Sequence, residues 1–294
     1  MSHNLICILG PTASGKTKYA VRLAAETGGE IISADSRQVY RGMDIGTGKD
    51  LDDYVFNGEK IPYHLIDIVD PGTKYNIFEY KKDFCKAFTD IISRGRQPIL
   101  CGGSGLYIES VTRGYRLAEV PPDPQLRANL EKLSMDELTQ RLASMKRLHN
   151  ITDLDSKKRV IRAIEIAMYE IDNPDEYESD NSSGPKFTTR YIGISVSREE
   201  RVVRIDKRLK ERLRGGMIEE VERLLAGGLT PEDLIYYGLE YKYVTLYITG
   251  KLTYNQMEEQ LAIAIHQFAK RQMTWFRGME RRGIKIEWIT TDKL

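Results

Sequence analysis

The chain has 294 residues, enough for one large domain or two modest ones at ~100–200 residues per domain. Its 44 lysines and arginines nearly balance 43 aspartates and glutamates, so the net charge of +1 neither favours nor excludes a nucleic-acid partner. The three cysteines lack metal-ligand spacing, and no segment approaches the ~18 apolar residues of a membrane span. These features exclude a membrane-spanning chain and a structural zinc protein, and we expect a cytoplasmic protein.

A glycine-bounded loop lies between an apolar run at residues 5–9 and a helix-spaced segment at 19–25. In such a strand–loop–helix unit the backbone N–H groups of the loop point inward, and the N-terminus of the helix is the positive end of the helix dipole. Both features favour the binding of phosphates. Lys16 is expected to reach the terminal phosphates, and the Thr17 hydroxyl to hold a magnesium ion. A turn without a ligand is the alternative. The predicted phosphate loop is Gly10-Pro11-Thr12-Ala13-Ser14-Gly15-Lys16-Thr17.

Three further strands are predicted in the first half, at residues 30–34, 64–70 and 98–101. The first delivers Asp35 to its carboxyl end, where ligands of open α/β sheets bind, although an aspartate there could equally cap a turn. The last ends in a small-residue loop at 102–105, which either faces the ligand or is only a turn. Residues 39–49 are too rich in glycine for a regular element. A capping pattern at Asn76 opens a helix with a core stripe of Ile77, Tyr80, Phe84, Phe88, Ile91 and Ile92.

The strand–helix alternation stops near residue 121. The polar, helical segment that follows predicts an all-helical domain at 121–187, inserted into an α/β core made of residues 1–120 and 188–294. A basic cluster at 157–162 lies on one of its helices, either as a solvated face or as an RNA contact. The segment 170–185 is acidic and rich in serine and asparagine, which predicts a flexible loop.

The alternation resumes with a strand at 191–196 and a helix whose arginines at 201, 204, 208 and 212 share one face. These arginines either bind phosphate or form a solvated face, while Val202, Ile205 and Leu209 supply the buried stripe. A second capping pattern at Thr253 opens a long helix, and a strand at 285–289 closes the chain. The last part of the long helix is rich in basic and aromatic residues. This composition is typical either of an RNA contact or of core aromatic residues bordered by solvated basic residues. The inner face expected for this helix is Met257, Leu261, Ala264, Ile265 and Phe268.

Six segments, in order along nearly the whole chain, closely resemble the tRNA dimethylallyltransferases. They are residues 10–17, 33–40, 42–47, 64–71, 102–107 and 269–276. The resemblance implies an α/β fold with a P-loop NTPase-like parallel sheet flanked by helices and an inserted all-helical domain. It also implies transfer of a dimethylallyl group from dimethylallyl diphosphate to the exocyclic amine of the tRNA adenosine 3′-adjacent to the anticodon. The chain departs from the usual family pattern at residues 238–242 and 266–267.

The resemblance implies a role for each matching residue. The loop would hold the diphosphate leaving group, with magnesium on Thr17 and positive charge from Lys16, Arg208 and Arg204. Asp35 would accept the amine proton, which makes the implied catalytic set Asp35, Thr17, Lys16 and Arg208. The target base would leave its stack to enter the site. The implied tRNA-binding residues are Asp35, Ser36, Arg37, Gln38, Ser104, Arg127, Lys158, Arg159, Val160, Ile161, Arg162, Lys270, Arg271 and Trp275.

The expected partners are therefore the tRNA anticodon stem-loop and dimethylallyl diphosphate, with no membrane and no obligate protein partner. We expect a monomer, because no large apolar surface stripe is evident. Three alternatives stay open. An adenylate isopentenyltransferase would prenylate free AMP, ADP or ATP. A small-molecule kinase would use the loop for nucleotide and ATP binding, and a non-catalytic RNA-binding module would not need Lys16, Thr17 and Asp35.

Overall fold

The computed structural model describes residues 4–115, 119–145, 154, 156–174 and 185–290. The chain forms two compact units, one from Met1–Gly114 with Pro185–Leu294 and the other from Tyr115–Gly184. We describe each unit by itself. Within the described residues, no helix combines the length and apolar character that crossing a bilayer requires.

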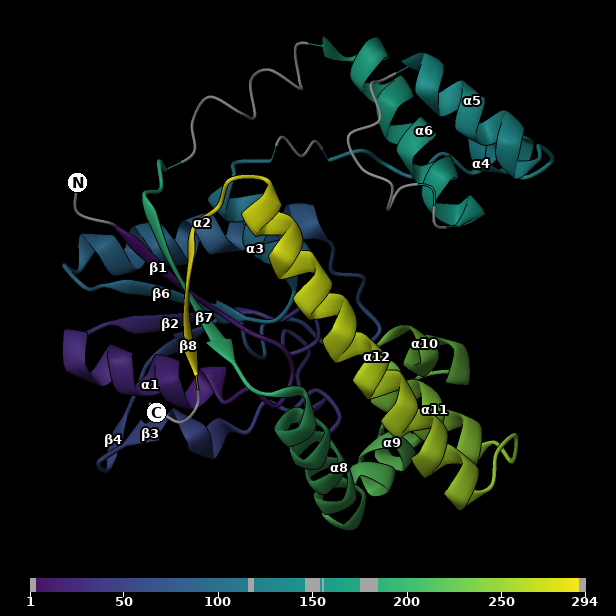
Figure 1. Ribbon diagram of the computed structural model, residues 1–294. Coiled ribbons are helices and arrows are strands. Elements are labelled where there is room, and N and C mark those ends of the chain that lie inside the picture. The colour runs from purple at the N-terminus through teal and green to yellow at the C-terminus, as the bar shows by residue number, and fades with distance from the viewer. Residues whose placement is uncertain (1–3, 116–118, 146–153, 155, 175–184, 291–294) are drawn as a thin grey trace. The chain divides into compact units, whose positions relative to one another are not determined.

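The larger unit is built on a six-stranded parallel sheet (Figure 1). In spatial order its strands are β5 (Tyr63–His64), β2 (Glu30–Ala34), β6 (Pro98–Gly102), β1 (Leu5–Leu9), β7 (Thr189–Ser195) and β8 (Ile286–Thr290). A separate antiparallel pair, β3 (Val55–Phe56) and β4 (Glu59–Lys60), follows the short 3-10 helix η1 (Leu51–Tyr54). The sheet confirms the predicted α/β class.

Helices cover both faces of this sheet (Figure 1). On one face, α1 (Lys16–Thr27) packs Ala20 and Val21 against strand residues such as Ile8. On the other face, α2 (Ile77–Ser93) and α3 (Gly105–Thr112) pack against residues that include Leu5 and Leu9. Because side chains alternate along a strand, β1 contributes to both cores. The phosphate loop thereby follows a strand that is fixed from both sides.

The last third of the chain is helical. It forms α8 (Arg198–Arg214), α9 (Met217–Ala226), α10 (Pro231–Tyr236), α11 (Leu239–Ile248) and α12 (Tyr254–Arg281). The 28-residue α12 contacts α3, α8 and α11, so it joins this helical group to the sheet (Figure 1). Capping boxes at Asn76 and Thr253 open α2 and α12 as predicted.

The structure corrects four details of the sequence-based prediction. The strand expected at 64–70 is only the two-residue β5, because Leu65 and Asp67 adopt left-handed backbone with φ of 62° and 55°, which turns the chain away from the sheet edge. The expected core residues Ile92, Val202 and Phe268 are instead exposed. Each lies at the margin of an otherwise correct helical stripe, where a small rotation decides burial.

A buried carboxylate ties β2 to the end of α2. Glu30 is 2% exposed, accepts hydrogen bonds from Arg94 (2.8 Å to Nη2), and lies 2.8 Å from the His64 ring. Hydrogen bonding from Arg94 lowers the pKa of Glu30 from 4.5 to about 2, although burial opposes the shift. The ionised group therefore stabilises the fold fully above about pH 4.5, and this contribution is lost as the pH falls toward 2.

Replacing Glu30 with glutamine should consequently flatten the dependence of the unfolding free energy on pH in this acid range. The measurement is denaturant unfolding at a series of pH values between about 5 and 2. Glu26→Gln is the matched control, since Glu26 is an exposed carboxylate of α1 that lies 3.9 Å from Arg22. Equal pH profiles for wild type and Glu30→Gln would contradict the assignment.

The smaller unit is a helical bundle with its own core. It contains α4 (Pro124–Leu130), α5 (Met135–Met145) and α6 (Lys157–Asp172). Its core includes Leu130, Leu138, Leu142 and Val160. The helix α6 continues to Asp172, so the acidic loop expected from residue 170 begins later, and its part at 175–184 lies outside the described residues.

Candidate active site

The phosphate loop occupies the turn between β1 and α1. Ala13 and Gly15 adopt left-handed backbone with φ of 61° and 84°, which curls the loop ahead of the first helical residue, Lys16. Gly15 is the N-cap and supplies no side-chain cap, so the first N–H groups of α1 are left for a ligand. The Ser14 hydroxyl is buried and has no hydrogen-bond partner among the described residues. An unsatisfied donor at a helix N-terminus suits a bound anion.

Three cations gather at this loop. Burial lowers the pKa of Lys16; Cys101 and Asp35 oppose this shift, whereas Arg208 and Arg212 add to it. Burial, and then the charge of Arg212, lower the pKa of Arg208 to about 10. An anion placed among these like charges would relieve their repulsion, and a diphosphate is the ligand that the loop pattern indicates.

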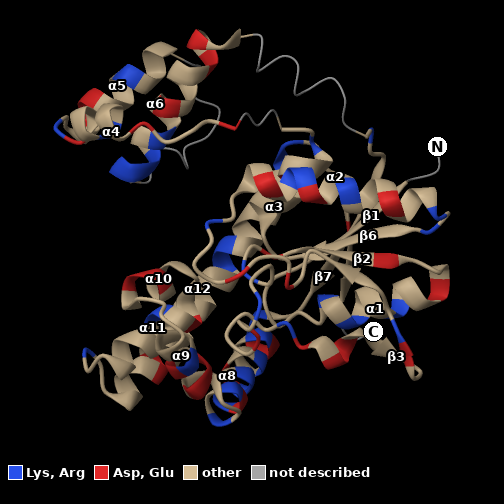
Figure 2. Ribbon diagram, turned by 180° about the vertical axis from the view of Figure 1, so that it is seen from behind, with Lys and Arg blue, Asp and Glu red and all other residues tan. Residues whose placement is uncertain are grey.

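Of the two arginines of α8 that were predicted to reach the loop, Arg208 does so and Arg204 does not. Arg208 donates a hydrogen bond to the Thr12 hydroxyl, but Arg204 pairs with Glu200 on its own helix. Arg212, with a 12% exposed side chain, pairs with Asp50 at 2.9 Å and adds its charge to the cluster. Figure 2 shows basic and acidic residues alternating along α8. Arg212 therefore replaces Arg204 as the proposed partner of Arg208.

The strands β2 and β6 are parallel neighbours, so their carboxyl ends lie side by side at the edge of the sheet where ligands of open α/β sheets bind. Asp35 follows β2, and its Oδ1 accepts a hydrogen bond from the Arg37 N–H at 2.9 Å. The Ser104 hydroxyl, which follows β6, accepts from the Ser36 N–H at 3.4 Å. Asp35 thus caps a turn and also lies near the cations, since its charge acts on both Lys16 and Arg208. The two alternative roles of Asp35 are compatible.

Gln272 of α12 links the two small-residue loops. Its Oε1 accepts the Thr12 N–H at 2.8 Å, and its Nε2 donates to the Gly103 carbonyl at 3.0 Å. The side chain is 7% exposed. Sequence reasoning missed this role, because the only signal was a polar residue three positions after the core residue Ala269 and four before Phe276.

Glu240 is a second acidic group near the cluster that the sequence did not assign. Burial raises its pKa, while hydrogen bonding to its own N–H and the charges of Arg212 and Arg208 act in the opposite direction. It lies within the segment 238–242 that departs from the usual family pattern. The site therefore contains a carboxylate besides Asp35.

Gln272→Leu should weaken the binding of inorganic diphosphate about tenfold, because a lost hydrogen bond to the loop costs about 1–3 kcal/mol. Isothermal titration with inorganic diphosphate and magnesium measures the effect. Gln267→Leu is the control, since Gln267 is an exposed residue of the same helix. Identical affinities for Gln272→Leu and wild type would show that the loop holds its shape without this link.

Comparison with known proteins identifies the family. The sequence model of the family described as "IPP transferase" matches residues 38–279. The chain belongs to this family. A tRNA dimethylallyltransferase of Bacteroides fragilis is 60% identical over 98% of this chain and 92% of its own length. A relative of the same name from Phocaeicola vulgatus is 58% identical over the same shares.

A solved structure from the IPP transferase family agrees with the fold. The tRNA isopentenylpyrophosphate transferase of Bacillus halodurans is 31% identical and superposes with a TM-score of 0.69, covering 98% of this chain and 90% of that one. The resemblance to tRNA dimethylallyltransferases and the P-loop-like α/β fold are therefore confirmed.

The helical unit carries a basic hollow of about 640 Å³. Arg127 and Arg162 both pair with the buried Glu165, which orients their guanidinium groups. The side chains of Val160 and Ile161 are buried in the core of the unit, so we narrow the proposed RNA contacts there to the basic groups. The hollow is lined by Arg127, Glu131, Lys157, Lys158, Ile161 and Arg162.

The end of α12 presents a second basic surface. Lys270 and Arg271 are exposed, and the Arg271 guanidinium lies 5.9 Å from the centre of the Phe268 ring. Trp275 is instead half-buried beside α3, where a Cβ added at Gly105 would lie 2.2 Å from its ring. Packing against α3 accounts for the position of the Trp275 side chain. We therefore limit the proposed RNA contacts of α12 to Lys270 and Arg271.

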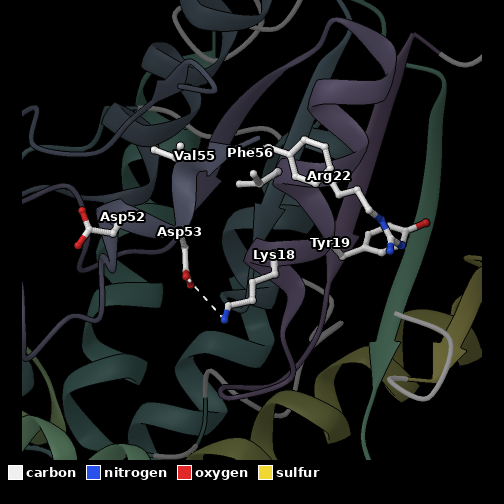
Figure 3. A pocket seen from close by; sticks show the side chains of 8 residues that line it. Lys18, Tyr19, Arg22, Asp52, Asp53, Val55 and Phe56 are labelled. Atoms are coloured by element: carbon white, nitrogen blue, oxygen red, sulfur yellow. Dashed lines mark ion pairs between the residues drawn. The ribbon is translucent and has the colours of Figure 1, made fainter. Parts of the chain in front are cut away.

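A separate hollow of about 340 Å³ lies between α1 and the β3 region (Figure 3). The Lys18 ammonium and the Asp53 carboxylate face each other across it at 3.8 Å. No residue of the loop 10–17 lines it, so this hollow is distinct from the phosphate site. It is lined by Lys18, Tyr19, Val21, Arg22, Asp52, Asp53, Val55 and Phe56.

Proposed function

We propose that the chain transfers the dimethylallyl group of dimethylallyl diphosphate to the exocyclic amine of the tRNA adenosine 3′-adjacent to the anticodon. The products are N6-(dimethylallyl)adenosine and diphosphate. The observation that carries the proposal is the cluster of Lys16, Arg208 and Arg212 at a phosphate loop that also faces Asp35. Relatives named tRNA dimethylallyltransferase, at 58–60% identity, support the same reaction.

The cation cluster serves the leaving group. Negative charge grows on the diphosphate as the carbon–oxygen bond breaks, and fixed positive groups stabilise that charge more than they stabilise the bound donor. Lys16 and Arg208 supply this charge at the loop, and the charge of Arg212 acts on both. The hydrogen bond from Arg208 to Thr12 holds this charge at the loop, which reduces the reorganisation that the reaction requires.

Magnesium fits the same place. Among the described residues, no three histidine, cysteine, aspartate or glutamate side chains lie close enough together to hold a metal. As in other phosphate loops, the ion would be held by the Thr17 hydroxyl and by oxygens of the diphosphate. When bound, magnesium would neutralise part of the charge on the leaving group.

Asp35 serves the acceptor. The amine nitrogen forms the new bond to carbon while the carbon–oxygen bond breaks, and the Asp35 carboxylate takes the proton that the nitrogen loses. The adenine must leave its stack to present this amine, as in other base-modifying enzymes. The turn after Asp35 contains Ser36, Arg37 and Gln38, and Ser104 is hydrogen-bonded to it. These residues would contact the extruded base. Exposed Lys158, Arg159, Lys270 and Arg271 would contact RNA phosphates elsewhere.

The test offers radiolabelled dimethylallyl diphosphate and magnesium with unmodified tRNA, or with AMP, in parallel. The proposal expects label in tRNA and none in AMP. Label in AMP alone would identify the adenylate isopentenyltransferase reaction instead. Turnover of ATP without a prenyl donor, and no label in either acceptor, would favour a kinase.

A further inference from the structure

Tyr236 is the last residue of α10, and Tyr237 is the C-cap that follows it. The two side chains have different surroundings. Tyr237 is 3% exposed and packs its edge against the Tyr40 ring at a centroid distance of 4.6 Å. Tyr236 is 53% exposed. The Tyr236 ring packs against the Tyr237 ring at a centroid distance of 5.6 Å, and about half of the residue's surface stays accessible to a ligand.

The exposed ring lies beside the turn that carries Asp35. The guanidinium of Arg37 lies over the Tyr236 ring, 5.1 Å from its centre. The backbone of the same Arg37 donates the hydrogen bond to Asp35. Tyr236 is therefore joined to the Asp35 turn through a single residue, although the two are 201 positions apart by sequence number, from 35 to 236.

A third group, Tyr107, also lies near this turn. The pKa of Tyr107 is raised by burial and then by Tyr40, and Arg37, Tyr236 and Asp35 also act on it. Tyr107 belongs to α3, which begins after the small-residue loop of β6. The exposed Tyr236 ring and the Arg37 guanidinium therefore lie next to the turn that carries Asp35.

We propose that Tyr236, with Arg37 above its ring, is a stacking platform for the nucleobase next to the adenine that enters the site. This inference rests on the proposed function. Unpaired RNA bases stack on aromatic rings and on guanidinium planes, and a ring already held by a guanidinium loses little side-chain freedom on binding. When the target adenine is extruded, its neighbour loses a stacking partner, and the platform replaces it.

The test compares Tyr236→Leu and Tyr236→Phe with wild type in steady-state transfer from dimethylallyl diphosphate to tRNA. Tyr236→Leu removes the aromatic face and keeps apolar bulk. It should raise KM for tRNA about tenfold, and it should change KM for the prenyl donor less than about twofold. Tyr236→Phe keeps the ring and should stay within about twofold of wild type.

The control is Tyr254→Leu, because Tyr254 is also exposed, at 38%, and packs against Tyr247 of α11 much as Tyr236 packs against Tyr237. Its KM for tRNA should not change. Titration of the anticodon stem-loop, without the prenyl donor, should show the same affinity order as KM.

Two results would overturn the platform: an unchanged affinity of Tyr236→Leu for the stem-loop, or an equal loss in Tyr236→Phe. A wild-type chain that binds the stem-loop but transfers no prenyl group would refute the proposed function alone. The binding titration would still decide the role of Tyr236.

Discussion

Asp35→Asn should lower the rate of dimethylallyl transfer to tRNA by about 10²–10⁴-fold, the range typical for loss of a general base. The amide keeps the size of the side chain and its oxygen can still accept the Arg37 N–H, so the turn after β2 should persist. What is lost is the capacity to take the proton from the amine. The measurement is single-turnover transfer with saturating donor and tRNA.

Two controls separate chemistry from structure in this variant. Binding of inorganic diphosphate should stay within about threefold of wild type, since Lys16 and the arginines are untouched. Asp52→Asn changes an exposed aspartate of η1 and should leave transfer unchanged. A transfer rate for Asp35→Asn within about twofold of wild type would contradict the assigned role.

Glu220→Gln should destabilise the larger unit by about 3 kcal/mol, because several hydrogen bonds to one buried charge are disturbed together. Glu220 of α9 is 1% exposed. Its carboxylate accepts the backbone N–H groups of Asp44 (2.9 Å), Ile45 (2.8 Å) and Gly46 (3.0 Å), and the Tyr241 hydroxyl at 2.7 Å. A glutamine has only one acceptor oxygen, and its N–H₂ group would replace the other oxygen. Some of these donors would then face a donor or lose their acceptor.

Urea unfolding measures this loss. Glu219→Gln is the control, because Glu219 is the exposed neighbour on α9 and should change stability by less than about 0.5 kcal/mol. Equal midpoints for Glu220→Gln and wild type would show that the loop does not depend on the carboxylate. A shifted midpoint with an unchanged slope would show that stability changed while the surface exposed on unfolding did not.

The loop held by Glu220 also matters for the site. The buried Lys49 binds the carboxylates of Asp44 (2.7 Å) and Asp67, and the Tyr40 carbonyl at 2.6 Å. Gln38, from the turn after Asp35, donates to the Gly48 carbonyl at 3.1 Å. The glycine-rich segment 39–49 therefore acts as a fixed support for the proposed base pocket, although it has no helix or strand.

The sequence predicted the parts of this structure that depend on local chemistry. The phosphate loop, the strand before Asp35 and the capping boxes at Asn76 and Thr253 each depend on residues a few positions apart. The strand at 64–70 failed for a local reason that the apolar pattern does not record, namely the left-handed backbone of Leu65 and Asp67.

Long-range contacts were beyond such reasoning. The bond between Gln272 and Thr12 spans 260 positions, and the bonds from Glu220 to the 44–46 backbone span 174 to 176. Arg204 and Arg212 share one face of α8, and only the packing of this helix decides which of them lies beside Arg208. The position of Tyr236 could not be predicted from the sequence pattern around it, because the Arg37 side chain over its ring belongs to a turn that is distant in the sequence.

The most direct test of the account is to map the product in tRNA. Unmodified tRNA is incubated with the wild-type chain, dimethylallyl diphosphate and magnesium, then digested and analysed by mass spectrometry of its fragments. We expect one dimethylallyl group on the adenosine immediately 3′ of the anticodon, with one diphosphate released for each group transferred. A prenyl group on any other nucleotide, or diphosphate released without modified tRNA, would contradict it.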